Sequence, residues 1–191
     1  IPLRLVGSEM CIRDRLMSRL SMVFQDVYLF DDSLIANIRV GRPDASDEEV
    51  FRAADLSGVT SIANRLGWHT PVGEGGRLLS GGERQRVSVA RALLKQAPIV
   101  LFDEATSALD AENEANILAA MDELREQSTF IVIAHKLDTI KSADQIVVLD
   151  EHGQVSQLGT HSELSDVPGI YRHFWQQRKA ASGWKISSGR D

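Results

Sequence analysis

LSGGERQR, residues 79–86, is the stretch on which the predicted architecture depends. Ser80 and Glu83 have the spacing of a capping box, in which each side chain bonds a free backbone N–H group at the start of a helix. Gly81 and Gly82 let backbone approach backbone, and the N–H groups and dipole of a helix start favour an anion such as phosphate. The stretch therefore predicts a helix over about residues 82–95 with an anion-binding start. An ordinary capped helix is the alternative for this motif alone.

IVLFDE, residues 99–104, is an unbroken apolar run that ends in two carboxylates. Pro98 separates it from the preceding helix, since proline cannot extend the helical hydrogen-bond ladder. The run predicts a buried parallel strand that delivers Asp103 and Glu104 to its carboxyl end, where open α/β sheets bind ligands. A strand that runs into acidic turn residues is the alternative.

Two more apolar stretches predict neighbouring strands of the same sheet. Residues 20–24 end at Gln25, and residues 129–134 end at His135. Because the carboxyl ends of parallel strands meet at one edge, we expect His135 to lie near Asp103 and Glu104. Taken alone, Gln25 would be a solvated loop residue and His135 a structural or solvated one.

The remaining elements are predicted from capping pairs and from periodicity. Ser46 with Glu49 forms a second capping box, and Thr160 with Glu163 forms a third. Apolar residues at helical spacing predict helices after residue 46, weakly over 59–66, and over 111–126 and 170–179. Residues 143–149 are a predicted strand, and residues 154–158 are its hairpin partner.

Four short motifs occur in the order and at the intervals of one family. They are LSGGE at 79–83, DE at 103–104, SALD at 107–110 and His135. Together they resemble the ATP-binding cassette (ABC) ATPases over residues from about 16 to about 179. In that family these motifs are the signature motif, Walker B, the D-loop and the H-switch, and Gln25 falls at the Q-loop.

The resemblance is stronger for exporter-type half-transporters. FQD at 24–26, LFD at 29–31 and IANI at 35–38 are similar to that type, and VGE at 72–74 resembles its motif for sensing membrane domains. A plain glycine-rich loop is the alternative for the last of these. The resemblance implies an α/β fold, a P-loop NTPase-like (RecA-like) parallel sheet flanked by helices. It also implies an ABC helical subdomain over about residues 43–97.

The resemblance also implies an ATP hydrolase of the ABC transporter type, with ATP and Mg²⁺ as ligands. Asp103 and Gln25 would hold the Mg²⁺ ion, which prefers oxygen ligands. Glu104 would orient or deprotonate the attacking water, and His135 would contact the γ-phosphate. These are the metal-binding and catalytic residues expected from the family.

An opposing cassette completes the expected site. In the family the signature residues bind the ATP held by a second cassette, here through Ser80, Gly81, Gly82 and Glu83. Asp110 would connect the two sites across that interface. The expected partners are therefore a second cassette, identical or different, and transmembrane domains that bind a small-molecule cargo. The apolar loop at residues 27–30 is explained by such a partner surface.

Composition limits the class of protein. The chain has 191 residues, 43% apolar and 25% charged, which is ordinary for one soluble globular domain. Its net charge of −6 argues against a nucleic-acid partner. Cys11 is the single cysteine, and no apolar run is long enough to span a bilayer. We expect a location at the cytoplasmic face of the cell membrane, held there by transmembrane domains that this chain does not contain.

Residues 1–15 do not match the pattern of the rest of the chain, because they show no helical or strand periodicity that continues into the domain. In the family, strands and a phosphate-binding loop precede Leu16, yet Gly-x-x-x-x-Gly-Lys-[Ser/Thr] occurs nowhere in the chain. Residues 6–15 resemble translated sequencing-adapter sequence, so residues 1–15 are predicted to be non-native; a divergent genuine N-terminus is the alternative. The chain alone, with its N-terminal strands and P-loop missing, is expected to be inactive. Residues 180–191 are expected to form a flexible tail.

Three functions are compatible with these motifs. The first is the C-terminal part of an exporter-type cassette, the second a non-transport ABC ATPase, and the third an interaction fragment without catalysis. The stretches 40–43, 110–116 and 174–184 are similar to half-transporters that handle iron–siderophores. Multidrug or lipid export is the alternative cargo class, because cassettes do not touch cargo and the likeness is association rather than chemistry.

Overall fold

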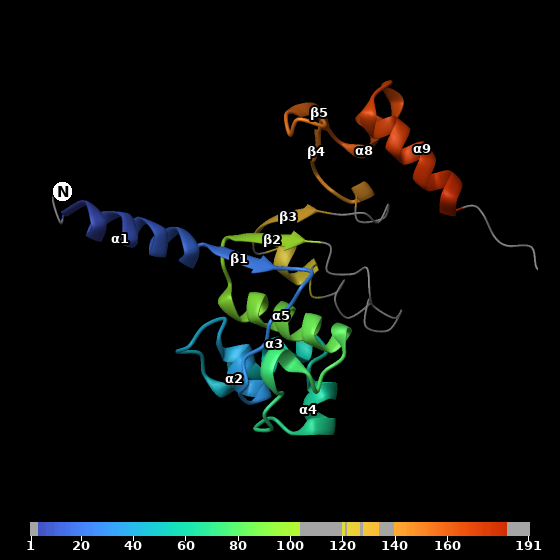
Figure 1. Cartoon of the computed structure of the whole chain (residues 1–191). Helices are drawn as coiled ribbons and strands as arrows, with labels where there is room; N and C mark the ends of the chain where they lie inside the picture. Colours follow the sequence, from blue (N-terminus) through green and yellow to red (C-terminus); the bar gives the residue numbers. More distant parts are fainter. Residues whose placement is uncertain (1–3, 104–119, 121, 127, 134–139, 183–191) are drawn as a thin grey trace, which may run out of the picture. The chain divides into compact units, whose positions relative to one another are not determined.

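The computed structural model describes residues 4–103, 120, 122–126, 128–133 and 140–182 (Figure 1). The chain divides into two compact units, residues 1–133 and residues 134–191. In the part of the chain just given, none of the helices is both long and apolar enough for a bilayer span.

The first unit contains a three-stranded parallel sheet in the order β1-β2-β3. Its strands are β1 (Leu20–Val23), β2 (Ile99–Asp103) and β3 (Thr129–Ile133). Val23 pairs with Phe102, and Asp103 pairs with Ile133, so the three carboxyl ends share one edge, as the arrowheads in Figure 1 show. The parallel sheet and its strands were predicted from the sequence and are confirmed.

Helix α5 (Gly81–Lys95) covers one face of this sheet. Val87 and Ala90 are fully buried on the helix, and Val23, Val100 and Phe102 are buried on the strands. Burying each of these valine and phenylalanine side chains contributes roughly 1.5–3 kcal/mol. The helix predicted over residues 82–95 is therefore confirmed, with its start at Gly81.

Four short elements pack on the other side of α5 (Figure 1). They are α2 (Leu34–Arg39), α3 (Asp47–Leu56), α4 (Thr60–Leu66) and the 3₁₀ turn η1 (Glu74–Gly76). The predicted capping box of α3 is present, since Ser46 and Glu49 bond each other's backbone N–H groups. Helix α2 was not predicted; it has only 6 residues, too few to show a period, and Ser33 caps it through the Ala36 N–H.

Residues 4–18 form helix α1 (Arg4–Ser18), although residues 1–15 show no helical or strand periodicity that continues into the domain. The side chains of residues 11–18 are all exposed, so the helix has no buried face over those residues. Hydrophobic periodicity cannot reveal a helix without a buried face. Such a helix forms because residues such as Leu, Met and Arg have a high helix propensity. Whether residues 1–15 are native stays a prediction.

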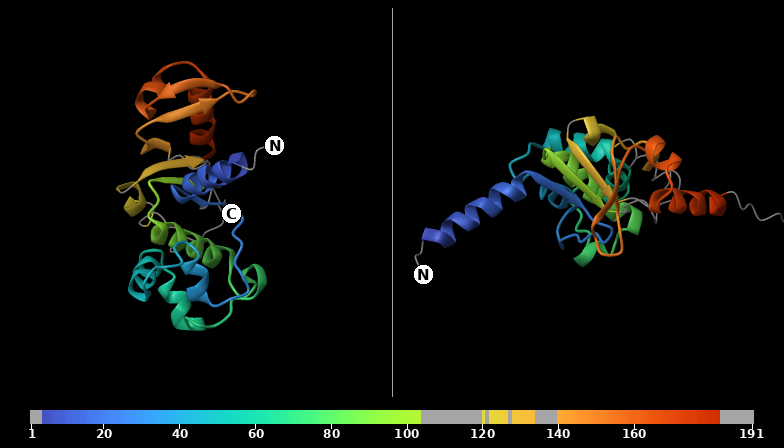
Figure 2. Two further views of the ribbon diagram at one scale, coloured as in Figure 1. Left: turned by 90° about the vertical axis from the view of Figure 1, so that its left-hand side faces the viewer. Right: turned by 90° about the horizontal axis from the view of Figure 1, so that it is seen from above.

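The second unit joins an antiparallel hairpin to two helices (Figure 2). The hairpin strands are β4 (Ile146–Leu149) and β5 (Val155–Gly159), followed by α8 (His161–Asp166) and α9 (Ile170–Ser182). Tyr171 is buried: its hydroxyl lies 2.8 Å from His161 Nδ1, and its N–H donates to Gln157 Oε1 at 3.0 Å. The predicted hairpin and the Thr160–Glu163 capping box are confirmed.

The contact between α2 and α5 generates a prediction for Gly41. A Cβ at this position would lie 2.3 Å from the carbonyl oxygen of Arg91, which is backbone and cannot yield without moving α5. We expect Gly41→Ala to lower the free energy of unfolding by about 1–3 kcal/mol, the usual cost of overpacking. Urea unfolding followed by circular dichroism measures it.

Gly81→Ala is the matched control. A Cβ there meets nothing nearer than the Arg84 side chain at 3.9 Å, and alanine favours a helix. Its stability should equal or slightly exceed that of the wild type. Equal unfolding midpoints for the two variants would contradict the packing inferred at Gly41.

Candidate functional site

The start of α5 has the geometry that the sequence predicted. Ser80 Oγ accepts the N–H of Glu83 at 3.2 Å, and Glu83 Oε2 accepts the N–H of Ser80 at 2.8 Å. Ser80 and Gly81 are exposed, and Gly82 is half-buried. The capping box therefore satisfies two backbone donors while the glycines leave the helix start open to solvent.

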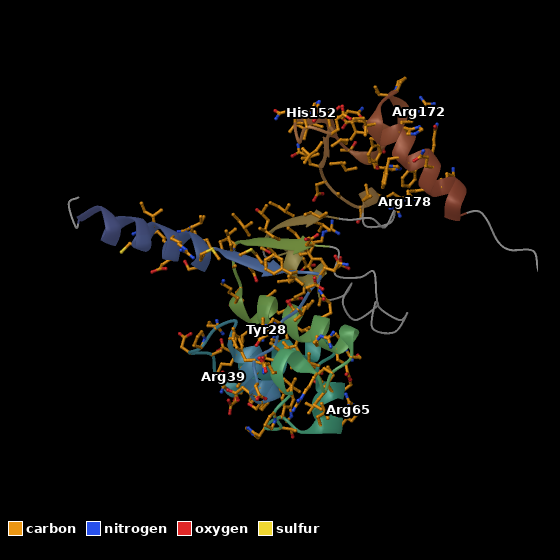
Figure 3. All side chains as sticks on the ribbon, in the orientation of Figure 1. Tyr28, Arg39, Arg65, His152, Arg172 and Arg178 are labelled. Atoms are coloured by element: carbon orange, nitrogen blue, oxygen red, sulfur yellow. The ribbon has the colours of Figure 1, made fainter. Side chains whose placement is uncertain are left out.

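Glu83 is held by two partners. Its second oxygen, Oε1, lies 2.5 Å from the Arg65 guanidinium of α4 (Figure 3). Burial alone would raise the pKa of Glu83, but the Ser80 N–H and the Arg65 guanidinium outweigh it and lower the pKa below its usual value. Glu83 is therefore a carboxylate at neutral pH, and it orients Ser80 and joins α4 to the helix start.

The carboxyl edge of the sheet gathers two of the predicted site residues. Asp103 is the last residue of β2. β1 ends at Val23, which pairs with Phe102, so Phe24 leaves β1 at the same edge. Gln25 follows as an exposed residue, while Asp103 is half-buried. Glu104, Asp110 and His135 lie outside the described residues. β3 ends at Ile133, which pairs with Asp103.

Gln85 joins the helix start to this edge. Its Nε2 donates to the carbonyl of Phe24 at 3.3 Å, and its side chain is 5% exposed. A buried amide needs such a partner, because an unpaired one would cost about 1–3 kcal/mol. Sequence analysis assigned Gln85 no role. The structure shows that it connects the signature helix to the residue preceding Gln25.

Arg91 and Asn37 form a second connection that the sequence analysis missed. The Arg91 guanidinium donates to Asn37 O at 2.7 Å, Asn37 Oδ1 at 2.8 Å and Tyr28 O at 2.9 Å. Burial lowers the pKa of Arg91 to about 10, so the group stays charged at neutral pH. A sequence signal existed, since each residue is a lone polar group within an apolar helical run, where a buried partner is expected.

The loop after Gln25 has both buried and exposed apolar side chains. Leu29 is fully buried and Val27 packs against the core, whereas Tyr28 and Phe30 are 56% and 51% exposed. The two exposed rings meet edge to face at 5.7 Å (Figure 3 labels Tyr28). Phe24 adds a third exposed ring. Grouped exposed aromatic side chains are typical of a contact surface.

The donor set at the sheet edge fits Mg²⁺. The Asp103 carboxylate and the Gln25 amide oxygen are hard oxygen ligands, which Mg²⁺ prefers. Within the residues whose placement is described, no group of three or more His, Cys, Asp or Glu side chains could hold a metal. Softer transition metals prefer sulfur and imidazole, which neither Asp103 nor Gln25 supplies.

These features define a class: a parallel α/β sheet with carboxylate and amide at its carboxyl edge, tied to a glycine-started helix. The family model described as "ABC transporter" matches residues 6–107. The chain therefore belongs to the ABC transporter family.

Relatives within the family have different names. The ATP-dependent lipid A-core flippase of Neisseria meningitidis serogroup A is 48% identical over 160 residues, 83% of this chain and 26% of that protein. The mycobactin import ATP-binding/permease protein IrtB of Mycolicibacterium thermoresistibile is 48% identical over 170 residues, 88% of this chain and 29% of that protein. The chain thus spans about a quarter of the length of these curated relatives.

A solved structure shares the fold. A bacterial Atm1-family ABC exporter with ATP bound superposes with a TM-score of 0.79 at 42% sequence identity. The match covers 90% of this chain and 29% of that chain. The predicted fold class, an ABC-type α/β domain with helices flanking a parallel sheet, is confirmed.

The lowered pKa of Glu83 generates a prediction about acid stability. A carboxyl group whose pKa is lower in the folded than in the unfolded state stabilises the fold at pH values above its unfolded pKa of 4.5. This stabilisation is lost as the pH falls through the pKa of the folded state. Glu83→Gln keeps an acceptor for Ser80 but removes the charge beside Arg65. We expect the substitution to lower the free energy of unfolding by about 0.5–1 kcal/mol at pH 7, because solvent partly screens the ion pair. This loss of stability should disappear near pH 3, where the carboxyl group is protonated. Urea midpoints at both pH values measure it.

Glu151→Gln is the control, because Glu151 is 86% exposed in the turn between β4 and β5. Its midpoints should follow the wild type at both pH values. A Glu83→Gln penalty that is as large at pH 3 as at pH 7 would show that the carboxylate charge does not stabilise the helix start.

Proposed function

We propose that this chain is the nucleotide-binding part of an exporter-type transporter, which couples ATP binding and hydrolysis at a cassette dimer to transport. The observation that carries the proposal is one connected unit: the open, Ser80-capped start of α5, linked through Gln85 to the edge bearing Gln25 and Asp103. The anion-binding helix start suits the phosphates of a nucleotide held by an opposing cassette, and the oxygen-ligand edge suits the magnesium–triphosphate held by this chain.

At the sheet edge, Asp103 and Gln25 would hold Mg²⁺, which when bound neutralises charge on the β- and γ-phosphates. Glu104 follows Asp103 directly and would orient or deprotonate the attacking water. His135, two residues after β3 ends, would contact the γ-phosphate. The pairing of β2 with both neighbouring strands supports this arrangement, because it brings the three chain segments to one edge.

At the helix start, Ser80, Gly81 and Gly82 would bind the nucleotide of an opposing cassette. The exposure of Ser80 and Gly81 supports this role, since a ligand carried by another chain must reach them from solvent. Glu83 would act by orienting Ser80, and Asp110 would connect the two sites. The second cassette, identical or different, is therefore part of the proposed active unit.

The exposed aromatic side chains on either side of Gln25 would meet transmembrane domains. Phe24, Tyr28 and Phe30 offer apolar area directly beside the proposed nucleotide edge. A contact there would let the membrane domains sense the state of the site. The chain would accordingly work at the cytoplasmic face of the membrane.

The role of Glu104 is testable in the transporter assembled with its membrane domains. Glu104→Gln keeps the size of the side chain but removes the base, so we expect ATP turnover to fall by at least about 10²-fold. ATP binding should stay within about twofold, because the phosphate contacts remain. Steady-state ATPase assays and nucleotide titration measure the two effects.

Glu151→Gln, in the turn of the second unit, should leave both quantities unchanged. Wild-type-like hydrolysis by Glu104→Gln would remove Glu104 from the mechanism. Loss of nucleotide binding in that variant would instead show that Glu104 serves to bind the ligand.

For the cargo we propose an iron–siderophore. The support is the likeness of residues 40–43, 110–116 and 174–184 to half-transporters of that class and the 48% identity to a relative named for mycobactin import. Lipid export is the competing cargo class, since equally similar relatives are named lipid A-core flippases. The cassette sequence distinguishes these two cargo classes only by likeness to relatives, because cassettes do not touch the cargo.

Deletion of the gene distinguishes the two cargo classes. Under the siderophore proposal the deletion strain should grow poorly with that siderophore as sole iron source, and a plasmid copy should restore growth. Normal growth under that condition, combined with altered lipid composition of the outer leaflet, would favour lipid export.

A further inference from the structure

Helix α5 holds the segment on either side of Gln25 from two points along its length. Gln85 bonds the carbonyl of Phe24, and Arg91 bonds the carbonyls of Tyr28 and Asn37. Arg91 lies 11 residues after Ser80, about 16 Å along the helix axis. The same rigid element therefore carries the proposed nucleotide contact at its start and the loop contact near its end.

Asn37 makes the loop itself stiff. Its side chain is 0% exposed, and its Oδ1 accepts the Phe30 N–H at 2.9 Å. Its Nδ2 donates to carbonyl oxygens at 3.0, 3.1 and 3.3 Å, those of Phe30, Ser33 and Asp32. The backbone of residues 30–33 thus folds around one amide, and that amide is bonded to Arg91 at 2.8 Å.

Arg91 also sets the position of the exposed rings. Its guanidinium carbon lies 6.0 Å from the centre of the Phe30 ring, and its Nη1 holds the backbone of Tyr28 at 2.9 Å. All three of its hydrogen-bond acceptors are neutral oxygens. The fork geometry of a guanidinium is needed to reach them together, and a lysine ammonium cannot reproduce it.

We propose that Arg91 is a positioning residue that, with Asn37, transmits movement of the nucleotide end of α5 to the aromatic loop at residues 27–30. The inference rests on the proposed function, because it needs nucleotide at Ser80 and a membrane partner at the loop. It assigns to Arg91 no contact with ATP. Its effect is on the ratio of transport to hydrolysis.

The test uses the transporter assembled with its membrane domains in lipid vesicles. Arg91→Lys keeps the charge but loses the fork, and Asn37→Asp keeps the Oδ1 acceptor but loses the three donated bonds. For both variants we expect ATP affinity and basal hydrolysis within about twofold of wild type, and cargo moved per ATP reduced about tenfold, within the usual range of coupling between sites. Arg172→Lys is the matched control, since Arg172 also donates to a backbone carbonyl, that of Asp166, in the second unit.

Hydrogen exchange gives a readout that does not depend on transport. In both variants the amides of residues 28–33 should exchange faster, while those of α5 keep their protection and so show that the fold is intact. Faster exchange with an unchanged transport ratio would make Arg91 and Asn37 merely structural. Unchanged exchange of the amides of residues 28–33 would show that Arg91 and Asn37 do not hold the aromatic loop, and would overturn the proposal.

Failure of the proposed function is recognisable separately. A wild-type transporter without ATP-dependent transport contradicts the proposed function, and the coupling role of Arg91 with it. A wild-type transporter that works normally, beside an Arg91→Lys form with an unchanged ratio, contradicts the role of Arg91 alone.

Discussion

The burial of α5 between the parallel sheet and the short helices α2–α4 is the constraint on which the first unit depends. Residues 87–90 of this helix are buried, so it packs on both sides. A helix buried this way must satisfy every polar group that it carries inward. Gln85 and Arg91 do so by bonding backbone carbonyls of the segment that follows β1.

The same hydrogen bonds contribute to the stability of the fold and to the proposed function. The bonds that make a buried glutamine and a buried arginine tolerable also hold the backbone next to Gln25 and the exposed aromatic loop. In the same way, the capping box that stabilises the start of α5 orients Ser80 and leaves Gly81 open. A substitution of Gln85 or Arg91 is therefore expected to change both the stability of the fold and the proposed coupling, and the two effects must be measured separately.

Local features were predictable where the signal was local. Three capping boxes were recognised from Ser or Thr followed by Glu three residues later, and all three are present because both partners lie within one helical turn. The strands before Gln25 and through Asp103 were predicted from uninterrupted apolar runs. Helices α1 and α2 were not predicted, since one has no buried face over residues 11–18 and the other spans fewer than two turns.

The sequence by itself determined the family, the parallel sheet and the position of Asp103 at the end of a strand, because each follows from a contiguous motif or apolar run. Only the tertiary structure decided that Arg91 and Asn37, 54 positions apart, share hydrogen bonds, and that Gln85 reaches Phe24 across 61 positions. It also decided that Leu29 turns inward while Tyr28 and Phe30 turn out. The physical reason is that such contacts follow from how α5 docks on the sheet and on α2, which no local pattern of residues encodes.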